Sequence, residues 1–311
     1  MDVLRPVFEA LNLQVLQRGW LSSNNILFVP PHGPCAVVDT GYASHSEQTV
    51  ALLEAQLQGR PLQSIVNTHL HSDHCGGNAD LQRRWPECRT SVPQGALQMA
   101  QSWDEDSLSF RLTGQRCERF SVQGFLQPGS SLELGGHEWQ IHATGGHDED
   151  AVVLFEPSTR VLISGDALWR RKVAVIFPEL AGEAGFAPAL QALDLIEALN
   201  PSIVIPGHDA PFTEVTDALK LSRQRLHRWQ NDPAAHARHA ARVLMMFHMM
   251  ELQACSPDEL KFWFSSTPMA QRAHVQGLLD LDAQGISSSI LDSLLQDGAL
   301  VRAAEQVRLA S

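Results

Sequence analysis

The sequence lacks the features of several protein classes. Its five cysteines, Cys35, Cys75, Cys88, Cys117 and Cys255, are odd in number and form no C-x-x-C pair. This spacing argues against a disulfide framework and a cysteine zinc cluster, and it predicts buried free thiols. No apolar run approaches the roughly 20 residues that span a bilayer, and the start of the chain does not resemble a signal peptide. We therefore expect no membrane partner and a cytoplasmic location.

Basic residues are also scarce. The chain has 23 Lys and Arg against 35 Asp and Glu, for a net charge of −12. Residues 1–217 carry 13 basic and 26 acidic residues, whereas residues 218–311 carry 10 and 9. An acidic body repels a polyanion, so nucleic acid is disfavoured as a partner. With 44% hydrophobic residues, the chain has enough apolar surface for a sizeable core.

Short β runs and turn signals dominate the first two thirds of the chain. Periodicity also predicts helices over 45–59 and 187–199, the second ended by Asn200-Pro201. Gly135-Gly136 and Pro157-Ser158 mark two hairpins. The predicted strands are 11–17, 25–30, 35–41, 62–68, both arms of the hairpins within 130–146 and 151–166, and 201–209.

The last hundred residues change to helical patterns. Helices are predicted over 234–254 and 287–298, a capping box over 256–259, and a hairpin over 299–310. Helices followed by a hairpin suggest a small winged-helix-like domain over 218–311, after a catalytic domain over 1–217. We interpret this tail as a packing or dimerisation module, which allows a homodimer.

A cluster of histidines follows the predicted strand over 62–68. The stretch H-x-H-x-D-H comprises His69, His71, Asp73 and His74. In extended chain, residues 69 and 71 point to one side and offer two imidazoles to one ion. Asp73 and His74 follow where the chain turns, and they can face a second ion. Imidazole and carboxylate together suit zinc, and also iron or manganese.

Three more ligand candidates follow later β runs. Each of His147, Asp166 and His208 lies beside a glycine. Residues at strand ends converge on one edge of a layered α/β domain, so these residues would complete the site. The other histidines are predicted to be ordinary, and the His236/His239 pair is interpreted as part of a surface helix because no carboxylate or cysteine is near it in sequence.

This ordered motif set resembles the metallo-β-lactamase-fold hydrolase superfamily over about residues 20–212. The resemblance implies an α+β, four-layer αβ/βα sandwich with the site at its edge. It also implies two divalent metal ions, most often zinc. His69, His71 and His147 would bind one ion, Asp73, His74 and His208 the second, and Asp166 both. Asp39 would orient the motif loop through hydrogen bonds.

The expected activity is hydrolysis by a hydroxide that bridges the two metals. Asp73 would be the catalytic residue that orients it and passes its proton on. Zinc β-lactamases commonly carry cysteine where Asp166 stands, so the set is similar to the glyoxalase-II-like and lactonase-like branch. We therefore expect cleavage of a thioester, ester or lactone in a small acyl substrate.

The segment after Asp166 is a candidate for binding substrate. Trp169, Arg170, Arg171 and Lys172 would line the pocket mouth, where the basic residues would attract a carboxylate or phosphate. A solvated run of charge is the simpler interpretation. Residues 95–130 would cover the site or form an oligomer contact.

Three other functions stay open. The first is a metal-dependent nuclease or phosphodiesterase on the same fold, although residues 287–298 have no Lys or Arg to contact phosphates. The second is a non-catalytic regulator that binds a small molecule. Against it, all seven expected metal-ligand positions carry a suitable residue. The third is a di-iron redox role, as in flavodiiron proteins.

Overall fold

A computed structural model describes residues 4–281 and 285–310. Its first sheet has six strands, of which β1, β2 and β3 pair antiparallel and β3 to β6 pair parallel. The carboxyl ends of β3, β4 and β5 therefore lie at one edge. The strands are β1 (Leu13–Leu16), β2 (Asn25–Phe28), β3 (Cys35–Val38), β4 (Leu62–Val66), β5 (Arg89–Pro93) and β6 (Gly124–Leu126).

The second sheet has five strands in the order β11-β10-β9-β8-β7. Strands β10 and β11 pair parallel, so their carboxyl ends also share an edge. The predicted hairpins around Gly135-Gly136 and Pro157-Ser158 are confirmed as β7–β8 and β9–β10. The strands are β7 (Ser131–Leu134), β8 (His137–Ala143), β9 (Val152–Glu156), β10 (Val161–Gly165) and β11 (Ile203–Pro206).

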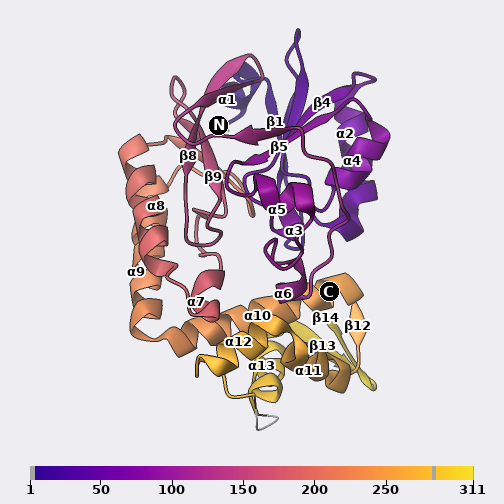
Figure 1. The fold of residues 1–311 in the computed structure, drawn as a ribbon, viewed down its shortest axis with the longest axis vertical. Coiled ribbons are helices and arrows are strands. Elements are labelled where there is room, and N and C mark those ends of the chain that lie inside the picture. The colour runs from indigo at the N-terminus through magenta and orange to yellow at the C-terminus, as the bar shows by residue number, and fades with distance from the viewer. Residues whose placement is uncertain (1–3, 282–284, 311) are drawn as a thin grey trace.

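The two sheets pack face to face and helices cover their outer faces (Figure 1). Apolar side chains of both sheets, including Ile26, Trp139 and Leu154, form the core between them. Helices α2 (Ser46–Leu57) and α4 (Asn78–Arg84) cover the first sheet, and α8 (Phe186–Leu199) and α9 (Val215–Asn231) cover the second. The predicted four-layer αβ/βα sandwich is confirmed.

Short helices connect these layers around the edge where the strands end. They are α1 (Leu4–Ala10), the 3-10 turn η1 (Ala43–His45), α3 (Ser72–Cys75), α5 (Leu97–Ser102), α6 (Phe110–Thr113) and α7 (Phe177–Ala181). Within the described ranges, none of the helices has the length and hydropathy to cross a bilayer. The predicted free thiols are confirmed: none of the five cysteines forms a disulfide, and four of them are buried while Cys117 is half-buried.

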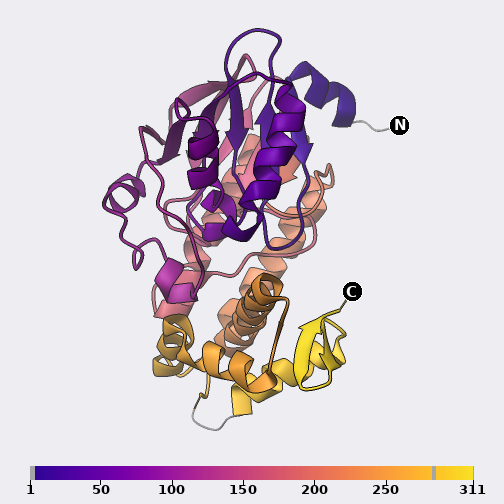
Figure 2. The ribbon, with the colours of Figure 1, turned by 90° about the vertical axis from the view of Figure 1, so that its right-hand side faces the viewer.

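The C-terminal part packs against the lower end of the sandwich (Figures 1 and 2). It contains α10 (Pro233–Leu252), α11 (Pro257–Ser266), α12 (Pro268–Val275), α13 (Gly285–Gln296) and a small sheet of β12 (Ala254–Cys255), β14 (Gln306–Leu309) and β13 (Leu300–Ala303). The capping box is confirmed, because Ser256 and Glu259 exchange side-chain hydrogen bonds at the start of α11. The winged-helix resemblance stays a prediction.

The predicted domain boundary lies inside a helix. Residue 217 is in the first turn of α9, and Leu219, Leu226 and Trp229 of this helix pack in the core on the outer face of the second sheet. Helix α10 instead packs in a separate core with Leu260 and Phe264 of α11. The change of partner therefore falls between α9 and α10.

Candidate metal centre

The histidine motif lies at the carboxyl end of β4. His69 and His71 are on the segment that leaves this strand, and Asp73 and His74 are on the one-turn helix α3. The glycines after it have ordinary right-handed backbone angles, with φ −62° at Gly76 and −84° at Gly77. They are needed for space rather than for a sharp turn, because a Cβ at Gly76 would lie 2.5 Å from both Ala43 N and Ser72 O.

The three later candidates come from the second sheet. His147 follows β8, Asp166 follows β10 and His208 follows β11. Gly207 allows close packing here, since a Cβ on it would lie 2.3 Å from an Asp166 carboxylate oxygen and 2.7 Å from His74. The edges of both sheets therefore meet at one place, and the structure brings all seven predicted metal-binding residues together in two groups.

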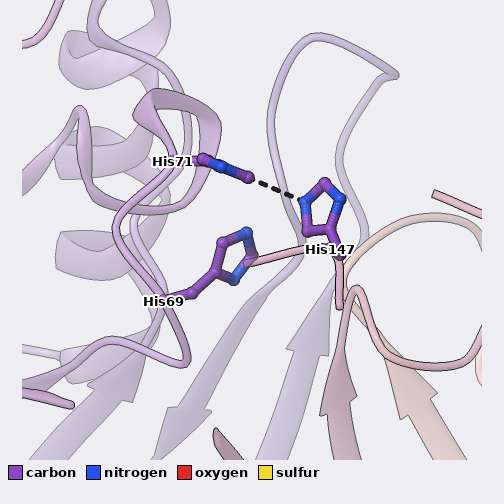
Figure 3. A group of neighbouring side chains, drawn as sticks. All are labelled: His69, His71 and His147. Atoms are coloured by element: carbon purple, nitrogen blue, oxygen red, sulfur yellow. Dashed lines mark hydrogen bonds between the residues drawn. The ribbon is translucent and has the colours of Figure 1, made fainter. Parts of the chain in front are cut away.

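One group contains three imidazoles. His69, His71 and His147 each offer a ring nitrogen, and these atoms lie within 4.8 Å of one another. Figure 3 shows His71 facing His147, with 2.8 Å between Nδ1 and Nε2, and His69 beside them. Three imidazole nitrogens that converge in this way match a catalytic zinc site that keeps a position open.

The second group mixes carboxylates and imidazoles: Asp73, His74, Asp166 and His208. His208 Nε2 lies 3.1 Å from Asp73 Oδ2, and His74 Nε2 lies 3.2 Å from Asp166 Oδ1. The other oxygen of Asp166, Oδ2, lies 3.4 Å from His147 Nε2 of the first group. Asp166 is thus the residue that faces both groups.

Hydrogen bonds outside the two groups fix the ring orientations. Asp39, in the left-handed region with φ 58°, accepts from Thr68 N at 2.9 Å and from the Thr68 hydroxyl at 2.8 Å. Its Oδ2 also lies 2.8 Å from His74 Nδ1, which leaves His74 Nε2 to face Asp166. His147 Nδ1 donates to Val175 O at 2.5 Å. Such partners set the tautomer of a ligand histidine.

The protonation states suit metal binding. Burial lowers the pKa of His71 and of His147 to about 4, and burial together with neighbouring His74 lowers that of His69 well below its usual value. These three rings are therefore neutral at pH 7, with lone pairs available to a cation. Burial alone would raise the pKa of Asp166, but His74 and other nearby histidines hold it well below the usual range.

His74, in the second group, has the opposite shift. Burial favours neutral His74, but the carboxylates of Asp166, Asp39 and Asp73 raise its pKa well above the usual value. The pKa of Asp73 is lowered, because His74 and His208 outweigh the effect of burial. A bound cation would replace the proton on His74 as the partner of these carboxylates.

One buried atom supports this fit. His69 Nε2 is fully enclosed and makes no hydrogen bond, although a buried polar nitrogen normally has a partner. A metal ion bonded to this nitrogen would remove the free-energy cost of burying it without a partner. Nitrogen and carboxylate donors accept zinc, iron and manganese, so the residues fit divalent metal ions without distinguishing among them.

The candidate substrate residues lie in different surroundings. Trp169 is buried and lies against Trp20 and His208. Arg170 forms an ion pair with Glu214, and Arg171 is exposed. Lys172 lies 4.1 Å from the Trp20 ring centroid and 3.6 Å from Asp209. Of the four, Trp169 alone lines the cavity beside the second group.

The sequence interpretation of His236 changes, and Tyr42 makes a contact that the sequence did not indicate. His236, assigned to a helix surface, is buried; it accepts a hydrogen bond from Ile176 N at 3.1 Å and packs on Trp229. The surface prediction was wrong for His236 because the helix face that carries it covers the sandwich. Tyr42 is buried and bonds Glu251 of α10 at 3.1 Å, so it joins the two parts of the chain.

Several residues near the site were missed. Asp148 lies 3.8 Å from His71 Nε2, and its place directly after His147 was a usable signal. Trp20, Phe177 and three residues of α10 line the cavity beside the second group. The sequence carried no signal for them, because apolar residues of these types also fill hydrophobic cores. Residues Thr113 and Gln115 show that part of the 95–130 segment also lines it.

Comparison with known proteins agrees with this geometry. The family model of the metallo-beta-lactamase superfamily matches residues 18–208. The chain belongs to this superfamily. A hydroxyacylglutathione hydrolase from Xanthomonas axonopodis pv. citri is 27% identical over 236 residues, covering 74% of this chain and 78% of that protein.

Other relatives match different lengths of the chain. The type A flavoprotein fprA of Rhodobacter capsulatus is 29% identical over 189 residues, which are 56% of this chain and 41% of the flavoprotein. The chain thus spans about two fifths of that relative. A metallo-beta-lactamase family protein from Thermus thermophilus has 20% identity and a TM-score of 0.53 over 96% of this chain and 98% of that one. This likeness shows a shared fold that includes the C-terminal part.

Proposed function

We propose that the protein is a dinuclear metal-dependent hydrolase that cleaves an acyl bond in a thioester, ester or lactone. The observation that carries the proposal is the position of Asp166, with one oxygen 3.2 Å from His74 and the other 3.4 Å from His147. A carboxylate that faces two ligand groups can hold two ions close together. The hydroxyacylglutathione hydrolase relatives support an acyl substrate.

The residues would act as follows. His69, His71 and His147 would hold one ion, and Asp73, His74 and His208 the other, with Asp166 shared. When bound, the two ions supply a water activated at neutral pH and polarise the scissile carbonyl. Asp39 keeps His74 in the tautomer that presents Nε2 to the site.

Asp73 is the proposed catalytic residue. Its side chain borders the cavity, where an acyl substrate would enter, and its Oδ2 lies beside His208. A carboxylate in this position can orient the attacking water and accept its proton on an oxygen. Asp73 is ionised at neutral pH, since its pKa is lowered, so both of its oxygens can accept hydrogen bonds from such a water.

Metal quantitation followed by an activity panel tests this function. We expect about two equivalents of zinc, iron or manganese in natively purified protein, and turnover of thioesters, aryl esters or lactones. His69→Ala and Asp166→Ala should lose both metal and turnover. Metal-free protein without turnover would instead favour a ligand-binding regulator.

A small acyl molecule, rather than nucleic acid, is the proposed partner. Helix α13, which would enter a groove of DNA in a winged-helix protein, carries no Lys or Arg over Gly285–Gln296. Phosphate contacts dominate nucleic-acid affinity, and this helix offers none. Hydrolysis of phosphodiesters in preference to acyl substrates, with salt-sensitive binding in a gel shift, would establish the nuclease alternative.

A further inference from the structure

A cavity of about 490 Å³, including its open mouth, adjoins the candidate metal centre. Its inner end is formed by metal-ligand candidates of both groups, among them His71, Asp73 and Asp166. A molecule whose reacting carbonyl lies at the metals therefore extends into this space. The remaining wall has Thr113 and Gln115 as its polar members and is otherwise apolar, including Trp20, Trp169, Phe177, Val243, Leu244 and Phe247.

Aromatic rings border the metal ligands on two sides. Trp20 and Trp169 meet edge to face with centroids 5.3 Å apart, and each centroid lies 5.2 Å from that of His208. On the other side, the Phe177 centroid lies 5.3 Å from that of His71. An apolar group next to the reacting carbonyl would therefore contact aromatic carbon on both sides.

Helix α10 of the C-terminal part forms the far wall. Val243, Leu244 and Phe247 project into the cavity from one side of the helix, at helical spacing. The helix is fixed to the sandwich at two separated points: His236 accepts from Ile176 N, and Glu251 bonds the Tyr42 hydroxyl and pairs with Arg116. This apolar wall is thus held in place relative to the metal centre.

Among the described residues, no Lys or Arg lines this cavity. Two basic side chains that adjoin lining residues are already engaged: Lys172 lies on the Trp20 ring near Asp209, and Arg116, which follows Gln115, pairs with Glu251. A carboxylate or phosphate buried here would lose its hydration without gaining a cationic partner. The cavity wall beyond the metals therefore favours an uncharged group.

We infer that this cavity binds the acyl group of the substrate, and that this group is an uncharged alkyl or aryl chain lying between the tryptophan pair and helix α10. The inference rests on the proposed acyl hydrolysis and adds the substrate class. It separates this protein from an enzyme whose acyl group carries a carboxylate. The three residues of α10 are then specificity-determining residues.

An acyl series on the metal-loaded protein tests the inference. The substrates are acetyl, butyryl, hexanoyl and adipoyl thioesters of N-acetylcysteamine, a neutral thiol. We expect kcat/KM to rise from acetyl to hexanoyl by up to about fourfold for each methylene that is buried. Adipoyl has the same six-carbon length with a terminal carboxylate, and it should be at least about tenfold poorer than hexanoyl. Equal rates across the series, or a preference for adipoyl, would overturn the inference.

Two variants of α10 locate the effect. Phe247→Ala should lower kcat/KM for the hexanoyl thioester about tenfold, with a smaller loss for acetyl. Val243→Lys places a cation in the wall and should raise the adipoyl-to-hexanoyl ratio at least about tenfold. Phe262→Ala is the matched control, because Phe262 is 76% exposed on α11. If Phe262→Ala changes the series as much as Phe247→Ala does, the assignment to α10 is wrong.

A binding measurement separates this inference from the proposed function. Octan-1-ol, an uncharged ligand that cannot be hydrolysed, is titrated into metal-loaded protein and followed by NMR shifts. We expect saturable binding that Val243→Lys weakens and Phe262→Ala does not. Octanol binding without turnover of any thioester would support the assignment of the cavity as an apolar binding site and reject acyl hydrolysis. Turnover without octanol binding would retain the hydrolase and reject the cavity assignment.

Discussion

The sandwich and helix α10 contribute different kinds of side chain to the same cavity. The sandwich provides imidazoles and carboxylates at the ends of β4, β8, β10 and β11, together with the aromatic rings of Trp20 and Trp169, whereas α10 provides apolar side chains alone. Helix α10 provides Val243, Leu244 and Phe247. Strand ends at one sheet edge can bring polar groups from distant sequence positions together, whereas a helix presents a continuous apolar face. In the proposed function, the sandwich would determine the reaction and α10 would select the acyl group.

The first prediction tests whether the reaction depends on the ligand groups that the sandwich provides. Asp166→Ala removes the carboxylate that faces both ligand groups, so we expect kcat to fall about a thousandfold or more. Metal analysis should show loss of at least one equivalent per chain. Asp217→Ala, on the exposed first turn of α9, is the control and should retain metal and activity. Full activity of Asp166→Ala would reject a shared carboxylate.

The second prediction concerns the support of the metal ligands. Asp39→Asn keeps a side chain that tolerates φ 58° but replaces the charged acceptor of His74 and Thr68. We expect metal affinity to fall about 10- to 100-fold, measured by competition with a chelator. Unchanged affinity would show that Asp39 stabilises the loop without influencing the metal.

The third prediction concerns the contact between the two regions. His236 is buried against Ile176, and burial, with a smaller effect of His239, lowers its pKa to about 3. In the unfolded chain the pKa is near 6.5, so the unfolded state binds more protons between about pH 6.5 and 3. The free energy of unfolding therefore falls as pH falls through this window. Protonation of His236 in the unfolded chain should lower it by about 2 kcal/mol between pH 7 and pH 5.

Urea unfolding at pH 7 and pH 5 measures this contribution. His236→Gln retains an acceptor for Ile176 N but does not titrate. Between these pH values its free energy of unfolding should fall by about 2 kcal/mol less than that of the wild type. His227→Gln, on the exposed side of α9, should have the pH dependence of the wild type. Identical slopes for wild type and His236→Gln would show that His236 is not buried as the neutral ring.

The smallest expected effect lies within the C-terminal part. Ser256 accepts from Glu259 N at 3.2 Å at the start of α11, and Ser256→Ala removes this cap. We expect a loss of about 1 kcal/mol in the free energy of unfolding, with kcat/KM unchanged because α11 does not line the cavity. Ser266→Ala at the other end of α11 is the control and should cost less. A change in acyl preference by Ser256→Ala would show that the two regions are less separate than proposed.

The sequence predicted most of the sandwich because its strands are bounded by clear turn signals. The hairpin at Gly135-Gly136 has both glycines at positive φ, 65° and 84°, as its sequence indicates. Strands β5 and β6 were missed, because Arg89–Pro93 ends in proline and Gly124–Leu126 has only three residues and begins with glycine. In the structure β5 pairs with β4 and β6 pairs with β5. Helix α12 was also missed, because its few apolar positions are recognisable only against α7 and α11.

The sequence by itself determined the candidate ligand set, and the resemblance of that set to a known superfamily indicated the fold class. His69, His71, Asp73 and His74 are close in the chain, and the later candidates each follow a predicted strand, so local chemistry and strand order were sufficient. The shared position of Asp166 was already an expectation from the resemblance, and the tertiary structure supplied its geometry, with one oxygen near each group. Only the tertiary structure decided that His236 is buried. It also decided which apolar residues of α10 border the cavity; Leu244 does so while also packing in the C-terminal core. The sequence does not show whether an apolar side chain of α10 borders the cavity or is enclosed in a core, because this depends on how the helix packs against the sandwich.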